Sequence, residues 1–176
     1  KKHNYAWASD PQIDNRVRFS TEKVIHDLAD YTRQEKVNKI VEFCQLSNKH
    51  IQLRVCWEST GGKNCCKCEK CYRTMMGIIA SGGDPANLGF SESNKDILTK
   101  IRKHIKYKEK FDWVKIEFWL EIQKEMGTNK FSPKYVEGVH WIKDYNFDKV
   151  NKSILKDINA FIARVDRKIE YIINSS

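Results

Sequence analysis

The stretch CWESTGGKNCCKCEKC, residues 56–71, organises the whole chain. It holds five of the six cysteines of a 176-residue protein. Four of them follow the spacing C-x8-C-x2-C-x2-C, namely Cys56, Cys65, Cys68 and Cys71. Thiolates bind Zn²⁺ tetrahedrally, and closed four-sulfur sites are usually structural. The spacing therefore predicts a structural zinc site whose binding energy is also folding energy.

The adjacent pair Cys65 and Cys66 leaves the choice of ligand open, because neighbouring residues cannot easily place both sulfurs on one ion. Using Cys66 would shorten the gap to Cys68 to one residue, so we predict Cys65 as the ligand and Cys66 as a bystander. Four cysteines also suit iron–sulfur clusters, so the spacing favours zinc without excluding iron. Free or disulfide-bonded thiols are the third alternative.

The distribution of the cysteines also bears on the compartment. A secreted disulfide framework spreads its cysteines along the chain to close loops, whereas here they cluster. We therefore expect a reducing, cytoplasmic environment.

The composition is that of a globular protein, with 40% hydrophobic and 31% charged residues. No apolar run approaches the roughly 18 residues that a membrane span needs, and no signal-peptide pattern is present, so we expect no membrane contact. The net charge of +9 favours an anionic partner such as a nucleotide or nucleic acid. A solvated lysine-rich surface is the simpler explanation of the same charge.

Periodicity places the cysteines on secondary structure. Alternating apolar residues over 51–55 predict a half-buried strand that delivers Cys56. A helix opening at Glu69 or Lys70 would place Cys71 in its first turn and end at the two glycines 82–83.

The sequence patterns before and after the cysteine stretch predict mainly helices. Thr32 and Glu35 have the spacing of a capping box, before a helix in which Cys44 is predicted to be buried. Short strands are predicted over 5–8 and 23–26, with loop over 12–21. Helices are predicted over 94–107, capped by Ser91 or Ser93, over 111–126, which we expect at the centre of the core, and over 151–173. The predicted fold is predominantly α with a few short strands (α+β), with a boundary near residue 90 between regions 1–90 and 91–176.

The sequence around the cysteines resembles that of a known family. The segments LRVC (53–56) and NCCKCEKCYRT (64–74) resemble the C-terminal zinc site of QueC-like cyano-deazaguanine synthases and their relatives, whose pattern is LRVC and then NCGxCEKCxRT. These proteins belong to the PP-loop group of adenine nucleotide alpha-hydrolase-like ATPases. Glycine is usual where Cys66 stands, which agrees with Cys66 as a non-ligand. The preceding text is also similar, at Asp14, Ser20-Thr21-Glu22, His26-Asp27, Arg33 and Glu35-Lys36, so the resemblance covers roughly residues 9–90.

The resemblance implies that residues 1–90 are the C-terminal part of an α/β nucleotide-binding-type fold, followed by a helical extension. It also implies that His26, Asp27, Arg33 and Lys36 lie on the substrate or nucleotide side. A His–Asp pair could move protons, and arginine or lysine could hold phosphate. Surface salt bridges and helix capping explain the same residues without any chemistry.

The phosphate-binding fingerprint of the PP-loop group, SGGxDS, is missing. Residues 81–84 read SGGD, but Pro85 replaces the serine and the segment follows a helix, so a helix C-cap explains it better. ATP and Mg²⁺ are therefore expected only if an upstream nucleotide-binding half exists. The start without Met favours a fragment that is inactive alone. The alternative is a zinc-stabilised basic module that binds nucleic acid or protein.

Overall fold

A computed structural model of the chain describes residues 10–59, 61–91, 96–128, 130–132, 134–152, 156–159, 161–162 and 165. The described residues are mostly helical and include one antiparallel pair of two-residue strands, β1 (Arg18–Phe19) and β2 (Glu22–Lys23). The predominantly α class with few strands is thus confirmed. Among the described residues, no helix is both long and apolar enough to cross a membrane.

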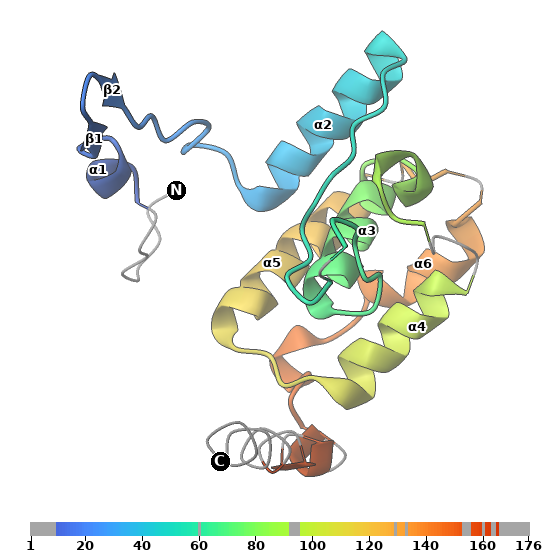
Figure 1. The fold of residues 1–176 in the computed structure, drawn as a ribbon. Coiled ribbons are helices and arrows are strands. Elements are labelled where there is room, and N and C mark those ends of the chain that lie inside the picture. Colours follow the sequence, from blue (N-terminus) through green and yellow to red (C-terminus); the bar gives the residue numbers. More distant parts are fainter. Residues whose placement is uncertain are drawn as a thin grey trace.

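Helix α3 (Glu69–Ala80) is the centre of the core, and all of its residues except Lys70 are buried. Helices α2 (Arg33–Ser47) and α5 (Trp113–Met126) pack against it. Helices α4 (Ile97–Lys103) and α6 (Val136–Lys143) pack against each other beyond it (Figure 1). Helix α6 also packs against α5, so α3, which directly follows the cysteines, and α5 together connect the other helices.

The prediction that the helix over 111–126 lies at the centre of the core is confirmed in part. Helix α5 packs against α2, α3 and α6 and buries Trp119, Ile122 and Met126. Trp113 and Leu120 are 54% and 43% exposed, so α5 is less completely enclosed than α3.

Local signals at the helix ends are confirmed. The Thr32 hydroxyl accepts a hydrogen bond from the Glu35 amide at 3.2 Å, and the Glu35 carboxylate accepts one from the Thr32 amide at 2.6 Å, as a capping box requires. After α3, Gly82 has φ +82°, and the Gly83 amide donates to the Ile78 carbonyl at 2.9 Å. Cys44 is half-buried on α2 against the core.

The predicted strand over 51–55 is an extended segment without a strand partner. The alternation itself is confirmed, because Ile51, Leu53 and Val55 are partly buried and the residues between them are exposed. Only the Leu53 amide finds a distant backbone partner, the Leu88 carbonyl at 3.1 Å in the 3₁₀ helix η1 (Pro85–Leu88). Alternation predicts which way side chains point, but a strand also needs a neighbour to pair with.

The later helices follow the sequence pattern in part. Helix α4 continues into a π-helical segment, η2 (His104–Lys108), and Asp96 rather than a serine precedes α4; Ser93 lies outside the described residues. A 3₁₀ turn, η3 (Phe147–Lys149), follows α6. Of the helix predicted over 151–173, residues 156–159, 161–162 and 165 are described and helical, whereas residues 151 and 152 are described and not helical. The strand predicted over 5–8 lies outside the described residues.

One cluster of buried side chains joins residues from both sides of position 90, from Val37 to Val150. The cysteine region and the later helices therefore share one core. Whether residue 90 also separates two regions of different ancestry stays a prediction.

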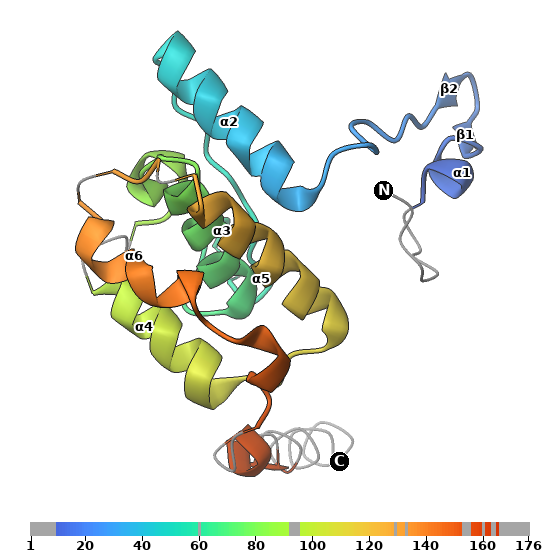
Figure 2. The same cartoon turned by 180° about the vertical axis from the view of Figure 1, so that it is seen from behind.

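The N-terminal segment is set apart from this core. Helix α1 (Pro11–Asp14), in the region predicted as loop, and the strands β1 and β2 lie away from the helical body in both views (Figures 1 and 2). The strand predicted over 23–26 is limited to its first residue, Lys23. We call residues 10–31 the N-terminal arm.

Candidate metal centre

The four cysteines selected by spacing come together in space. The sulfurs of Cys56, Cys65, Cys68 and Cys71 all lie within 4.8 Å of one another. The pairs Cys65–Cys71 and Cys56–Cys68 each have their sulfurs 3.9 Å apart. A tetrahedral ion with metal–sulfur bonds of about 2.3 Å would separate its ligands by about 3.8 Å. The four sulfurs are therefore placed to hold one metal ion.

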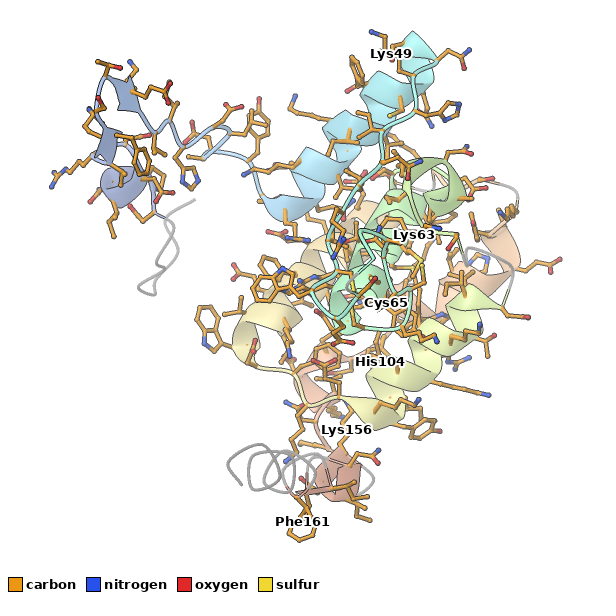
Figure 3. All side chains as sticks on the ribbon, viewed as in Figure 1. Lys49, Lys63, Cys65, His104, Lys156 and Phe161 are labelled. Atoms are coloured by element: carbon orange, nitrogen blue, oxygen red, sulfur yellow. The ribbon has the colours of Figure 1, made fainter. Side chains whose placement is uncertain are left out.

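Three local structures position these sulfurs. Cys56 ends the extended segment, Cys65 lies in the following turn (labelled in Figure 3), and Cys68 is the N-cap of α3. Cys71 is then in the first turn of α3, where the helix dipole favours a thiolate. Backbone amides of Lys67 and Cys68 point to the Cys65 sulfur, each at 3.4 Å, and so stabilise negative charge on it.

Cys66 points away from the other sulfurs. Its thiol lies against the Asn64 carbonyl, with 3.7 Å between sulfur and oxygen, and the residue is only 1% exposed. Its φ of +54° is in the left-handed region that favours glycine. The Cys66 sulfur is therefore outside the group of four sulfurs to which the adjacent Cys65 belongs.

The thiols differ in acidity when no ion is bound. Burial raises the pKa of Cys56, but hydrogen bonds from the Cys65 backbone and side chain outweigh it and lower the pKa to about 6. Burial raises the pKa of Cys68 to about 11 and raises that of Cys71 further, with hydrogen bonding to Cys68 adding to the effect on Cys71. A metal ion binding here would therefore displace protons from Cys68 and Cys71.

The Asn64 side chain holds this loop in shape, a role that was not predicted from the sequence. Its buried side-chain carbonyl accepts from the amides of Val55 and Cys56 at 3.0 and 3.3 Å. Its amide group donates to the carbonyls of Leu53 and Gly89 at 2.7 and 2.9 Å. One side chain thus supplies the hydrogen bonds that a neighbouring strand would have given to the segment before Cys56.

A buried ion pair connects the cysteine-bearing residues 56–71, which we call the metal loop, to the core. Glu69 and Arg73, one turn apart on α3, approach to 3.5 Å, and the Trp119 ring nitrogen donates to Glu69 at 3.0 Å. The Arg73 guanidinium lies 4.4 Å from the centre of the Phe118 ring. These contacts link the start of α3 to α5, so the cysteine loop and the core are structurally coupled.

The four candidate catalytic residues fall into two groups. His26 and Asp27 lie on the N-terminal arm, where the His26 ring nitrogen Nδ1 is 2.7 Å from Asp14 and Asp27 accepts from the Leu28 amide. Arg33 and Lys36 lie in the first turn of α2. The structure therefore pairs His26 with Asp14 rather than with the adjacent Asp27.

A hollow of about 310 Å³ lies elsewhere, between α2 and the segment that follows α3. Its lining includes Cys44, Lys49, His50 and Asp84, and none of the candidate catalytic residues or the four clustered cysteines. The metal centre is thus separate from this hollow.

Comparisons of the chain with protein-family models, with curated proteins and with solved structures found no match. The interpretation of the metal centre therefore rests on its own geometry.

Ligand assignment is tested by exchanging one thiol at a time. We expect one metal ion per chain in the wild type and in Cys66→Ser, because the serine hydroxyl can still donate to the Asn64 carbonyl. We expect Cys65→Ser to lose the ion or bind it much more weakly, since one of the four sulfurs is removed. Metal analysis of the purified variants measures this. Loss of metal in Cys66→Ser with retention in Cys65→Ser would reverse the assignment.

The role of Asn64 predicts a large effect on stability. Asn64→Ala leaves two amides and two carbonyls without their partner, so we expect the free energy of unfolding to fall by roughly 2–4 kcal/mol. The matched control is Asn87→Ala, at an exposed position in η1, which should change it by less than about 0.5 kcal/mol. Urea denaturation of the metal-loaded protein gives both values. Equal effects of the two substitutions would show that Asn64 does not organise the loop.

Proposed function

We propose that this chain is a zinc-binding protein in which a structural zinc ion joins the segment ending at Cys56 to the start of helix α3. The observation that carries the proposal is the meeting of four cysteine sulfurs within 4.8 Å. All four places of a tetrahedral ion are then taken by protein ligands, which is typical of structural zinc and leaves no open place for a substrate.

The same distances favour a single ion over an iron–sulfur cluster. In a [4Fe–4S] cluster each cysteine binds a different iron atom, and in a [2Fe–2S] cluster the cysteines bind in two pairs, so some of their sulfurs lie further apart than ligands of one ion. Here all four sulfurs lie within 4.8 Å of one another, as the ligands of a single ion do. A single iron ion with four thiolates would have the same arrangement, and metal analysis distinguishes it from zinc.

We further propose that residues 9–90 are the zinc-binding C-terminal portion of a QueC-like, PP-loop ATPase-related protein. The chain itself has no SGGxDS segment, so we propose that it is inactive alone. Two features support this ancestry. Cys66 has the positive φ suited to the glycine of the family pattern, and Asp14 and His26, both within the resembling text, are in contact. ATP and Mg²⁺ would enter only through an upstream nucleotide-binding half.

The coding sequence upstream of Lys1 tests this ancestry. We expect it to encode a buried strand followed by SGGxDS, because the PP-loop fold places its phosphate-binding amides there. A reading frame that starts near Lys1 would contradict the proposal and would leave the zinc site itself unaffected.

A second candidate function is a zinc-stabilised basic module that binds nucleic acid or protein. The specific observation in its favour is Trp57, which directly follows the first cysteine and is 85% exposed. A tryptophan held on the surface by a metal loop contributes little to the core. Its exposure favours a role in contact with a partner.

Zinc affinity should rise steeply with pH. Because the pKa values of Cys68 and Cys71 are raised in the metal-free chain, both thiols are protonated near neutral pH and each releases a proton when zinc binds. Release of these two protons predicts an apparent affinity that increases at least about hundredfold per pH unit, so zinc-dependent stability is lost as the pH falls. Competition with a chromophoric chelator at pH 6.5, 7.5 and 8.5 measures the slope. A slope of tenfold per unit or less would contradict proton release from both thiols.

A further inference from the structure

The metal loop presents an aromatic ring together with a positive charge. Trp57 is 85% exposed, and the Lys70 ammonium lies 3.0 Å from the centre of its ring. Trp57 lies next to Cys56, and Lys70 precedes Cys71, so two of the clustered cysteines fix this pair in place. Cation–π contact orients the indole and leaves most of the ring open to a ligand.

Two arginines lie near Lys70, where burial and then the charges of Arg73 and Arg33 lower the pKa of its ammonium. The guanidinium groups of Arg33 and Arg73 lie 5.9 and 4.4 Å from the centre of the same Phe118 ring. Arg73 is 5% exposed, and its Nε has no hydrogen-bond partner in the described part of the chain. Arg73 lines a narrow crevice together with Arg33 and Phe118.

Nearby acidic groups neutralise only part of this charge. Glu69 pairs with Arg73, and Glu121 also lines the crevice. Over the described residues, no carboxylate lies within salt-bridge distance of Arg33 or Lys70. Residues 54–73 contain five basic and two acidic side chains, which leaves a positive charge of one after the −2 of a zinc tetrathiolate. Arg33 adds to this, so an anion finds unpaired cations beside an open aromatic ring.

We propose that the surface formed by Trp57, Lys70 and Arg33 binds single-stranded nucleic acid. One base stacks on the open face of Trp57, and backbone phosphates contact Lys70 and Arg33. Single-strand binding proteins combine the same two components, because every base has a face that can stack and every nucleotide has a phosphate. The inference goes beyond the structural zinc site, deepens the binding-module alternative and does not depend on the QueC-like ancestry.

This surface suits a single strand better than a duplex. In a duplex the base faces are covered by their neighbours, so an exposed ring has nothing to stack on. Binding should therefore show little sequence preference, fall with salt as phosphate contacts do, and prefer single strands of RNA or DNA to a duplex.

Fluorescence anisotropy with labelled 12-nucleotide oligo(U) and oligo(dT) and with a 12-base-pair duplex tests the proposal on the full, metal-loaded chain. We expect Trp57→Ala to weaken single-strand binding by about five- to hundredfold, and Trp57→Phe to retain most of it because a ring remains. The matched control is Trp113→Ala, at another exposed tryptophan on α5, which should stay within twofold of the wild type.

The charge component is tested in the same assay. Lys70→Gln should weaken binding and flatten its salt dependence, whereas Lys49→Gln, at the far end of α2 (Figure 3), should change neither. Metal content is measured for every variant, so loss of the metal site and loss of nucleic-acid binding are distinguished.

Several outcomes would overturn the proposal. These are no binding by the wild type at low salt, equal binding of duplex and single strand, equal losses in Trp57→Ala and Trp113→Ala, and a loss in Trp57→Phe as large as that in Trp57→Ala. Competition by uridine monophosphate as strong as that by the oligonucleotide would indicate a nucleotide site instead.

Discussion

The meeting of four thiol sulfurs within 4.8 Å is the constraint on which the rest of the structure depends. It fixes the first turn of α3, and α3 is the helix against which α2 and α5 pack. A helix buried on nearly all sides cannot find its position from one amphipathic face alone. The sulfur cluster therefore gives the central helix a defined start, and the flanking helices follow from it.

Asn64 complements this constraint on the side away from α3. The sulfurs hold the loop at Cys56, Cys65, Cys68 and Cys71, while the Asn64 side chain holds the backbone that leads into and past the loop. The sulfur cluster and Asn64 replace the strand partner that the extended residues 51–55 do not have. Without them, this segment would bury amides and carbonyls that have no hydrogen-bond partner. The four cysteines and the buried Asn64 side chain therefore hold the same stretch of backbone in place.

Local features were predictable from the sequence and long-range ones were not. The capping box at Thr32, the start of α3 and its glycine end depend on residues within a few positions, and all were predicted correctly. The strand before Cys56 depended on a distant pairing partner, and this prediction was wrong. The central position of residues 111–126 was predicted only in part, because α5 packs against three helices but keeps exposed apolar residues. A lone asparagine has no periodic pattern, so the only signal for Asn64 was its place in the resembling segment 64–74, which gave it no role. The contact of His26 with Asp14 spans twelve residues of loop and short strands, and adjacency in sequence pointed instead to Asp27.

The compactness of the cysteine stretch has a consequence for how the protein assembles. All four sulfurs come from sixteen consecutive residues, whereas the contacts of α3 with α5 join residues about fifty positions apart, as in Glu69 and Trp119. Closing a short loop costs less chain entropy and occurs sooner than bringing distant segments together. During synthesis the metal loop can thus form while α5 and α6 are still unmade. With the proposed zinc ion, metal supply would then act at the first step of folding, before there is a core to protect.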